Sequence, residues 1–196
     1  METRRVVITG MGALTPVGNN VPAFWEGLLA GKNGIGPVTR FDTAEYKAKL
    51  AAEVKNFDPE TVLEKPEIRK TDRFVQYALA AAKEAMADSG IIGQVAPERL
   101  GVYFGSGIGG FETFDSEHTK LIEKGPRRVS PHFIPMMIAN IAAGTIAIKY
   151  GATGPCLPVT TACATGTNAV GEAFRAVRYG YADAILAGGS EAAITP

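Results

Sequence analysis

The amino-acid sequence predicts an α/β fold in which helices cover both faces of a mixed sheet. Four short apolar segments have the composition of buried strands, namely residues 5–9, 100–105, 156–161 and 183–188. Apolar side chains recur at helical spacing between and after them, in residues 21–30, 74–89 and 164–179. With 196 residues the chain is long enough for one core, and we expect one domain over residues 1–196.

Composition and charge exclude several classes of protein. Lys and Arg number 20, as do Asp and Glu, so no general affinity for nucleic acid is expected. The start of the chain, METRRVVITG, lacks the long apolar stretch of a signal peptide. The longest uncharged apolar run, residues 133–148, is shorter than the ~20 residues of a membrane helix, and Pro135 and Asn140 interrupt it. Two cysteines form no disulfide framework, so we expect a soluble cytoplasmic protein without nucleic-acid or membrane partners.

The first predicted strand, residues 5–9, runs into Gly10-Met11-Gly12 and then into the helical residues 21–30. A strand followed by two such glycines and a helix is typical of dinucleotide-binding folds. Thr15 stands where the third glycine belongs, and Pro16 breaks the expected start of the helix. The dinucleotide-binding fingerprint is therefore incomplete, and nucleotide binding remains only an alternative interpretation of this segment.

Residues 65–73 (KPEIRKTDR) are locally basic, and a helix is expected to begin within them. From the residues alone, the charges indicate a solvated helix face, which is the usual role of surface charge. The helical residues 74–89 direct their apolar side chains to one side, and Gly90 ends that helix.

The predicted strand 100–105 is followed by a loop, Ser106-Gly107-Ile108-Gly109-Gly110. Its glycines permit unusual backbone angles and a close approach of the backbone to a ligand. A phosphate-binding loop would carry a Lys and a Ser or Thr directly after the glycines, and Phe111-Glu112 follows instead.

Residues 131–150 are apolar on nearly every side. A helix with so little polar face is expected to be buried all round, either within a large core or against another subunit.

The stretch 154–171, GPCLPVTTACATGTNAVG, combines a short strand, a sharp turn and a helix, and places Cys163 at the turn. The unpaired N–H groups at the start of a helix favour negative charge, so they favour the nucleophilic thiolate and can stabilise an oxyanion. The small neighbours Ala162, Ala164 and Gly166 leave room for a substrate carbonyl. The pattern indicates a nucleophile elbow that carries sulfur, with an inert buried cysteine as the ordinary alternative.

The run from Gly154 through Val159 and Ala162-Cys163-Ala164-Thr165-Gly166 to Val170 resembles the active-site signature of the β-ketoacyl-acyl carrier protein synthases. From Arg4 onwards the chain is similar to the amino-terminal half of the elongating, synthase II type. Further stretches carry the likeness: VVITGMGALTPVGN, FWEGLLAGKNGI, GSGIGG, GPRRVSP and AGGSEAAITP. The resemblance implies the amino-terminal half of a thiolase-like αβαβα fold, with the carboxy-terminal half absent from this chain.

The resemblance also implies roles for individual residues. Cys163 is expected to be the catalytic nucleophile, and Ile108 to line the acyl-chain pocket, although an ordinary core isoleucine is equally compatible with the sequence. The apolar segment 131–150 is expected to lie in a homodimer interface, where Phe133 and Ile134 reach the partner's acyl pocket. Residues 156–161 are expected to pair with their twin across the dimer axis.

Acyl carrier protein is the second partner that the resemblance implies. A basic patch at the pocket mouth is expected to receive this acidic protein, and acidic neighbours such as Glu64 and Glu67 dilute the patch. Its expected residues are Lys65, Arg69, Lys70, Arg127 and Arg128.

The activity implied is that of a 3-oxoacyl-[acyl carrier protein] synthase of fatty acid elongation. Cys163 takes an acyl group as a thioester, and decarboxylative Claisen condensation with malonyl-acyl carrier protein follows. No metal or organic cofactor is expected, because the phosphopantetheine arm arrives on the carrier protein. Two catalytic histidines, a lysine and a second oxyanion donor belong to the other half in that family. His118 and His132 match neither histidine motif, so this half alone is expected to be inactive in condensation.

Two other classes of function stay open. A non-catalytic partner subunit, like the chain-length factors, generally lacks the nucleophile, and Cys163 within a complete signature counts against it. A nucleotide-binding oxidoreductase would rest on Gly10 and Gly12, and a nicotinamide cofactor would then raise the melting temperature.

Overall fold

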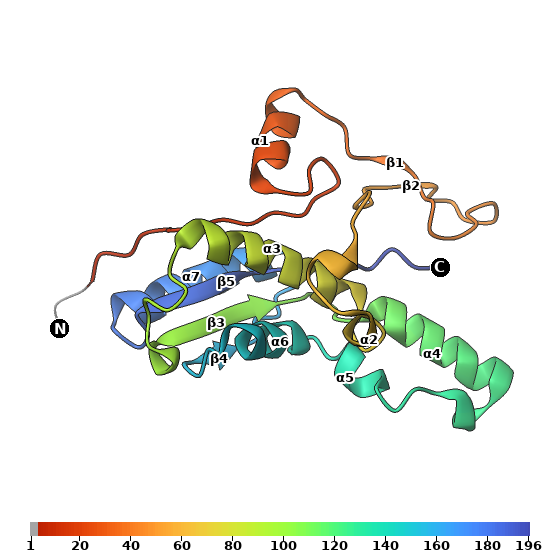
Figure 1. Ribbon diagram of the computed structural model, residues 1–196. Helices are drawn as coiled ribbons and strands as arrows, with labels where there is room; N and C mark the ends of the chain where they lie inside the picture. The colour runs from red at the N-terminus through yellow and green to blue at the C-terminus, as the bar shows by residue number, and fades with distance from the viewer. Residues whose placement is uncertain (1–3) are drawn as a thin grey trace.

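The computed structural model describes residues 4–196, so residues 1–3 of the predicted domain lie outside the described part. Figure 1 shows the elements, which are α1 (Val21–Leu29), β1 (Gly36–Pro37), β2 (Leu50–Ala51), α2 (Lys65–Ile68), α3 (Arg73–Ser89), β3 (Leu100–Gly105), α4 (Phe111–Lys124), α5 (Phe133–Met137), α6 (Ile141–Tyr150), β4 (Cys156–Leu157), α7 (Thr165–Arg178) and β5 (Ala184–Gly189). Single 3-10 turns occupy Pro59–Thr61, Pro97–Arg99 and Pro126–Arg128.

The central sheet has the strand order β4-β3-β5, and both pairs of neighbours are parallel. Successive side chains of β3 face opposite sides of the sheet. Val102 and Phe104 pack in one buried cluster with residues of α3 and α6, whereas Tyr103 packs with Ala173 and Ala176 of α7. The predicted α/β fold with helices on both faces is therefore confirmed, and an antiparallel β1–β2 pair lies outside the central sheet.

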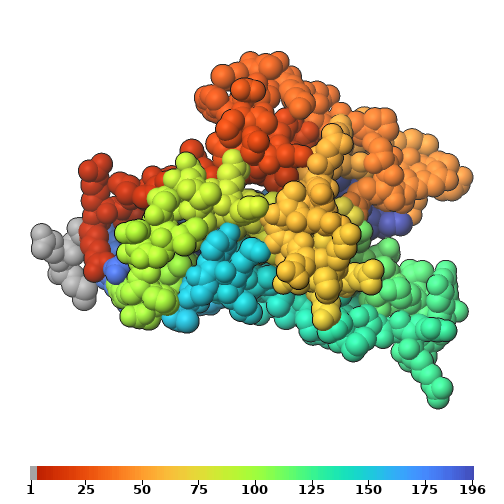
Figure 2. Space-filling view, in the orientation of Figure 1, coloured from red at the N-terminus to blue at the C-terminus, as the bar shows by residue number. Residues whose placement is uncertain are grey.

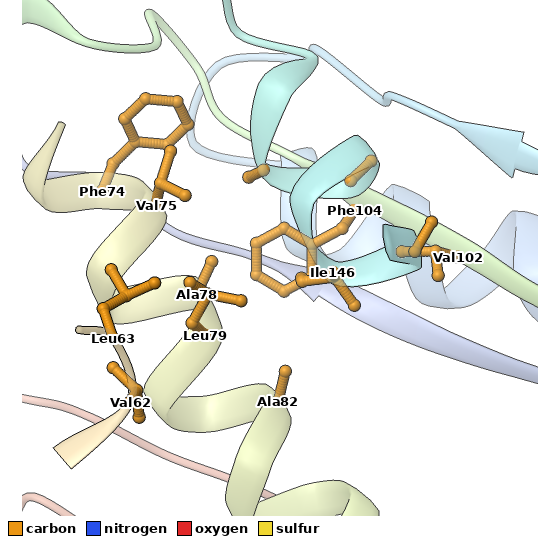
Figure 3. Packing of buried hydrophobic residues seen from close by; sticks show 13 residues of the cluster. Val62, Leu63, Phe74, Val75, Ala78, Leu79, Ala82, Val102, Phe104 and Ile146 are labelled. Atoms are coloured by element: carbon orange, nitrogen blue, oxygen red, sulfur yellow. The ribbon is translucent and has the colours of Figure 1, made fainter. Parts of the chain in front are cut away.

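The larger cluster is the main core, and Figure 3 shows its side chains at close range. Phe74 and Leu79 of α3 and Ile146 of α6 are fully buried in it. The helix α3 is well terminated: the Asp72 side chain accepts a hydrogen bond from the N–H of Phe74, and Gly90 ends the helix with a φ of 62°. The prediction for residues 74–89 is confirmed.

The prediction of a buried strand at residues 5–9 is wrong. These residues are extended but lie in no strand, and Val7 and Ile8 are exposed. The segment continues across α3, where the N–H groups of Met11 and Ala13 donate to the carboxylates of Asp88 and Glu84. The apolar, β-branched composition of residues 5–9 predicted a strand. The residues that follow them bind to side chains of α3, however, and pair with no strand of the sheet.

The prediction of a buried strand over residues 156–161 is also wrong in length and burial. β4 is only two residues long and is exposed, because it lies at the edge of the sheet and pairs on one side only, with β3. Pro158 follows directly and offers no N–H group to continue the ladder.

Residues 131–150 form two helices, α5 and α6, and not one helix that is buried all round. The buried side of α6 consists of Ala142, Ala143, Ile146 and Ala147, while Ile148 is 84 % exposed. Figure 2 shows α4 and the segment that follows it (green to teal) projecting from the body of the molecule. Among the described residues, no helix combines the length and apolar character needed to cross a membrane.

Candidate active site

Cys163 lies in a tight turn between β4 and α7, as the sequence predicted. Ala162, directly before it, has a φ of 50°, and the only other non-glycine residue with positive φ in residues 4–196 is Asn56. Two backbone hydrogen bonds form the turn: the N–H of Ala164 donates to Thr161 and that of Thr165 to Ala162, each at 3.1 Å. A left-handed non-glycine residue is strained, and such strain is concentrated at functional sites.

Two side chains brace this elbow. The Thr165 hydroxyl accepts a hydrogen bond from the N–H of Thr161 at 2.9 Å, and Asn168 donates its amide to the Thr161 hydroxyl at 2.8 Å. Thr165 is only 4 % exposed in relative terms and is the first residue of α7. The helix thus holds the turn in shape from inside the protein.

The side chain at the turn is accessible. Cys163 is exposed, and its N–H donates no hydrogen bond to any carbonyl within the described residues. Cys156 is also exposed, and partial desolvation of its sulfur raises the pKa of its thiol. Cys156 therefore has less thiolate at neutral pH than an ordinary cysteine.

The strand β3 approaches the elbow very closely at Gly105. A Cβ atom there would overlap the carbonyl oxygen of Val159 and lie 2.7 Å from Cγ2 of Thr165. Only glycine allows the end of β3 and the segment before the elbow to lie side by side at this distance.

The predicted pocket residues come from segments that contact one another. The loop of residues 106–110 lies against α5, because the N–H of Gly110 donates to the carbonyl of Met137 at 2.8 Å. Ile108 is 53 % exposed and is no core residue in this chain. On α5 the Phe133 ring lies 6.3 Å from the Phe114 ring of α4, and Ile134 is exposed.

The five predicted docking residues are exposed and fall into two groups. Lys65, Arg69 and Lys70 lie in or beside α2. This segment is near the start of α4, because Asp72, two residues after Lys70, accepts a hydrogen bond from the N–H of Thr113 in α4. Arg127 and Arg128 lie in the 3-10 turn that follows the carboxyl end of α4. The structure therefore distributes them along α4 and does not gather them at one point.

The clefts in the described part of the chain include a larger and a smaller one. The larger, of about 720 Å³, lies between the segment of residues 12–16, α3 and the chain after β5, and includes Arg40, Glu53 and Glu191. The smaller, of about 330 Å³, includes Tyr103, Leu157 and Glu172. Cys163, Ile108, Phe133 and Ile134 line neither of these two clefts.

Sequence reasoning missed the residues that support the elbow and the glycine loop. Thr165 and Asn168 stand four and seven positions after Thr161, a spacing that is compatible with contacts within one turn-and-helix unit. The Ser106 hydroxyl donates to Glu191, 85 positions away, and no local pattern predicts this contact.

Comparison with known proteins places the chain in a family. The family model described as "Beta-ketoacyl synthase, N-terminal domain" matches residues 3–196. The "3-oxoacyl-[acyl-carrier-protein] synthase 2" of Staphylococcus aureus (strain COL) is 53 % identical over 195 residues, which are 99 % of this chain and 47 % of that protein. The protein of the same name from Synechocystis sp. (strain ATCC 27184 / PCC 6803 / Kazusa) is 48 % identical over 197 residues, 100 % of this chain and 47 % of that protein.

Solved structures give the same result. "The ishigamide ketosynthase/chain length factor" superposes with a TM-score of 0.88 at 32 % identity, covering 97 % of this chain and 48 % of that one. A type II PKS acyl-carrier protein in complex with its ketosynthase (AntDE:AntF) superposes with a TM-score of 0.79 at 26 % identity, covering 99 % of this chain and 53 % of that one. The chain spans about half the length of the curated relatives that it matches. It belongs to the β-ketoacyl synthase family, and it carries the amino-terminal domain of that family.

Proposed function

We propose that the protein is a 3-oxoacyl-[acyl carrier protein] synthase of fatty acid elongation in which Cys163 carries the acyl group. The observation that carries the proposal is the elbow: an exposed thiol on a strained, braced turn, two residues before α7, with a free N–H on the same residue. The homologues named above support the choice of reaction.

The first step is acyl transfer. The Cys163 thiolate attacks the carbonyl carbon of an acyl thioester, and the carbon–sulfur bond to the carrier's phosphopantetheine breaks, releasing that arm as a thiol after it takes up a proton. The N–H of Cys163 donates to the oxyanion of the tetrahedral intermediate. The amino end of α7 favours the negative charge of that oxyanion.

The second step is condensation. Malonyl-acyl carrier protein loses carbon dioxide, and the resulting carbanion attacks the acyl thioester on Cys163 to give a 3-oxoacyl product and the free thiolate. This chain supplies the thioester but has no histidine in the expected catalytic motifs. His118 stacks on Phe114 in α4, with the ring centroids 5.9 Å apart, and His132 directly precedes α5. We therefore assign the decarboxylation step to residues outside these 196.

Partners follow from the exposed surfaces. A self-complementary dimer is supported by the edge strand β4, which leaves its outer side unpaired in the described chain, and by the exposed Ile134, Leu157 and Ile148. The exposed basic groups near both ends of α4 suit an acidic carrier protein. The cytoplasm is the setting that fits such a partner.

The test is the intact mass of the full-length protein before and after incubation with a long-chain acyl-acyl carrier protein. We expect an adduct of one acyl group that is absent in Cys163→Ala and retained in Cys156→Ala. A full-length wild-type protein that gains no acyl group, or an adduct that persists in Cys163→Ala, would rule the assignment out.

One observation favours a second candidate, a chain-length-factor-like subunit, because one structural neighbour is a ketosynthase/chain length factor. Such a subunit would not be acylated. The same mass experiment therefore distinguishes the two functions.

A further inference from the structure

Glu191 connects two loops that meet beside the elbow. Its Oε1 accepts a hydrogen bond from the Ser106 hydroxyl, and its Oε2 accepts one from the N–H of Gly107, both at 2.7 Å. Ser106 directly follows β3, and Glu191 lies two residues after β5. The carboxylate thus joins the carboxyl ends of two neighbouring parallel strands.

The Ser106 hydroxyl extends this connection into the glycine loop. Ser106 is 1 % exposed, and its Oγ accepts the N–H of Gly109 at 2.9 Å while its own proton goes to Glu191. Gly109 has a φ of 71°, which favours glycine. Three hydrogen bonds therefore fix the backbone on both sides of Ile108.

The loop fixed in this way is held between the elbow and α5. A Cβ atom on Gly107 would lie 3.4 Å from Cα of Ala162, the residue before Cys163. A Cβ atom on Gly110 would overlap the carbonyl oxygen of Met136 in α5. Ile108 projects from the middle of this loop, so its place relative to Cys163 depends on the loop's shape.

We infer that Glu191 is a positioning residue that sets the accepted acyl chain length, because it holds Ile108 in place through Ser106 and Gly107. The inference rests on the proposed function and on Ile108 as a pocket residue. Both partners donate a hydrogen bond to the carboxylate, and the buried Ser106 hydroxyl proton has this carboxylate as its acceptor. A glutamine can keep the N–H of Gly107 on its carbonyl oxygen and donate its NH₂ group to the Ser106 oxygen, but the buried Ser106 proton then loses its charged acceptor. Ile108 then withdraws more easily, and longer acyl chains gain access.

The test compares Glu191→Gln with wild type in the full-length protein. Intact mass gives the rate of acyl transfer to Cys163 from a medium-chain and from a long-chain acyl carrier protein. We expect the long-to-medium ratio of rates to rise by about fivefold or more, the loss of one hydrogen bond to a charged group being sufficient for this. Glu45→Gln, an exposed residue of the loop between β1 and β2, is the matched control and leaves the ratio unchanged. Alkylation of Cys163 by iodoacetamide, which needs no acyl pocket, stays within about twofold of wild type in both variants.

A second pair of variants separates positioning from general damage. We expect Ser106→Ala to raise the same long-to-medium ratio of rates. This variant replaces Glu191→Gln in the test if Glu191→Gln does not fold. In an Ile108→Ala background, Glu191→Gln has no further effect on the ratio, because residues that act through one another are not additive.

An unchanged or lower ratio in Glu191→Gln, or an undiminished effect in the Ile108→Ala background, overturns the inference and leaves the proposed function standing. A wild-type protein that accepts no acyl group overturns both.

Discussion

The buried carboxylate of Asp72 accepts two hydrogen bonds from Thr113, one from its N–H at 2.9 Å and one from its hydroxyl at 2.6 Å. The other oxygen of Asp72 accepts the N–H of Phe74 at 3.2 Å. One side chain thereby satisfies free N–H groups at the starts of both α3 and α4. This connection fixes the projecting helix α4, and with it the glycine loop before α4, to the core helix α3.

We therefore expect Asp72→Asn to destabilise the protein. An asparagine keeps one acceptor oxygen but turns an NH₂ group towards a backbone N–H donor. The free energy of unfolding then falls by about 2 kcal/mol, as expected for a buried, unsatisfied polar group. In a domain of this size, this lowers the thermal midpoint by about 4–8 °C. Asp115→Asn, on α4 but half-buried, is the control and stays within about 1 °C. An equal loss in both variants would contradict the special role of Asp72.

The brace of the elbow leads to a second prediction. Thr165→Val keeps the shape of the side chain but removes the acceptor for the N–H of Thr161. Cys163 then occupies its turn for a smaller fraction of the time, and we expect acyl transfer to Cys163 to slow by about tenfold, which corresponds to about 1.4 kcal/mol. Rates come from intact mass against time. Thr167→Val, exposed on the same helix, is the matched control, and an equal loss there would point to helix propensity and not to the brace.

The close approach at Gly105 leads to a third prediction. Because a Cβ would overlap the carbonyl oxygen of Val159, Gly105→Ala forces the end of β3 and the elbow segment apart. We expect a loss of about 3 kcal/mol in the free energy of unfolding, at the upper end of the range typical of overpacking in a core. Gly36→Ala is the control, since its Cβ would meet only the Nζ atom of Lys55, at 3.9 Å. Urea unfolding of the two variants tests the difference, and a Gly105→Ala protein as stable as Gly36→Ala would refute it.

These three contacts show which features the sequence made predictable. α3, β3 and the elbow at Cys163 followed from local patterns, because helical spacing, a short apolar run and a glycine-bounded turn each lie within a few residues. Residues 5–9 and 156–161 have the composition of buried strands, but a strand forms only where a neighbouring strand is present to pair with it. In the described chain, the first has no neighbouring strand and the second is limited by Pro158.

The supporting contacts of the site were beyond local patterns. Asp72 and Thr113 are 41 positions apart and Ser106 and Glu191 are 85 apart, so only the folded chain brings them together. The helix α4 was likewise unrecognised, because its exposed side carries Phe114, Leu121 and Ile122 and obscures the usual amphipathic pattern. The position of Cys163 in a turn before a helix was predictable, whereas the residues that hold this turn in place were not.

Glu117 on α4 leads to a prediction of pH dependence. Its carboxylate is buried, and it accepts hydrogen bonds from Lys120 and from the N–H of Ser130, the latter at 2.7 Å. Burial alone would raise the pKa of this carboxyl, but the two hydrogen bonds and the charge of Lys120 together outweigh it and hold the pKa below its ordinary value. A lowered pKa in the folded state means that the ionised group stabilises the fold above the unfolded pKa of about 4.3, and that this is lost as the pH falls through the folded pKa.

Glu117→Gln removes both the charge and its titration. We expect the variant to be less stable than wild type by about 1–2 kcal/mol at pH 7, since the chain after α4 loses its anchor at Ser130. The difference stays constant down to about pH 5 and shrinks as the pH falls towards about 3, because the wild-type carboxyl then becomes protonated. Urea unfolding across this range measures it, with Glu123→Gln, exposed on the same helix, as the matched control. If the difference grew on acidification, burial and not the contacts with Lys120 and Ser130 would determine the direction of the Glu117 pKa shift.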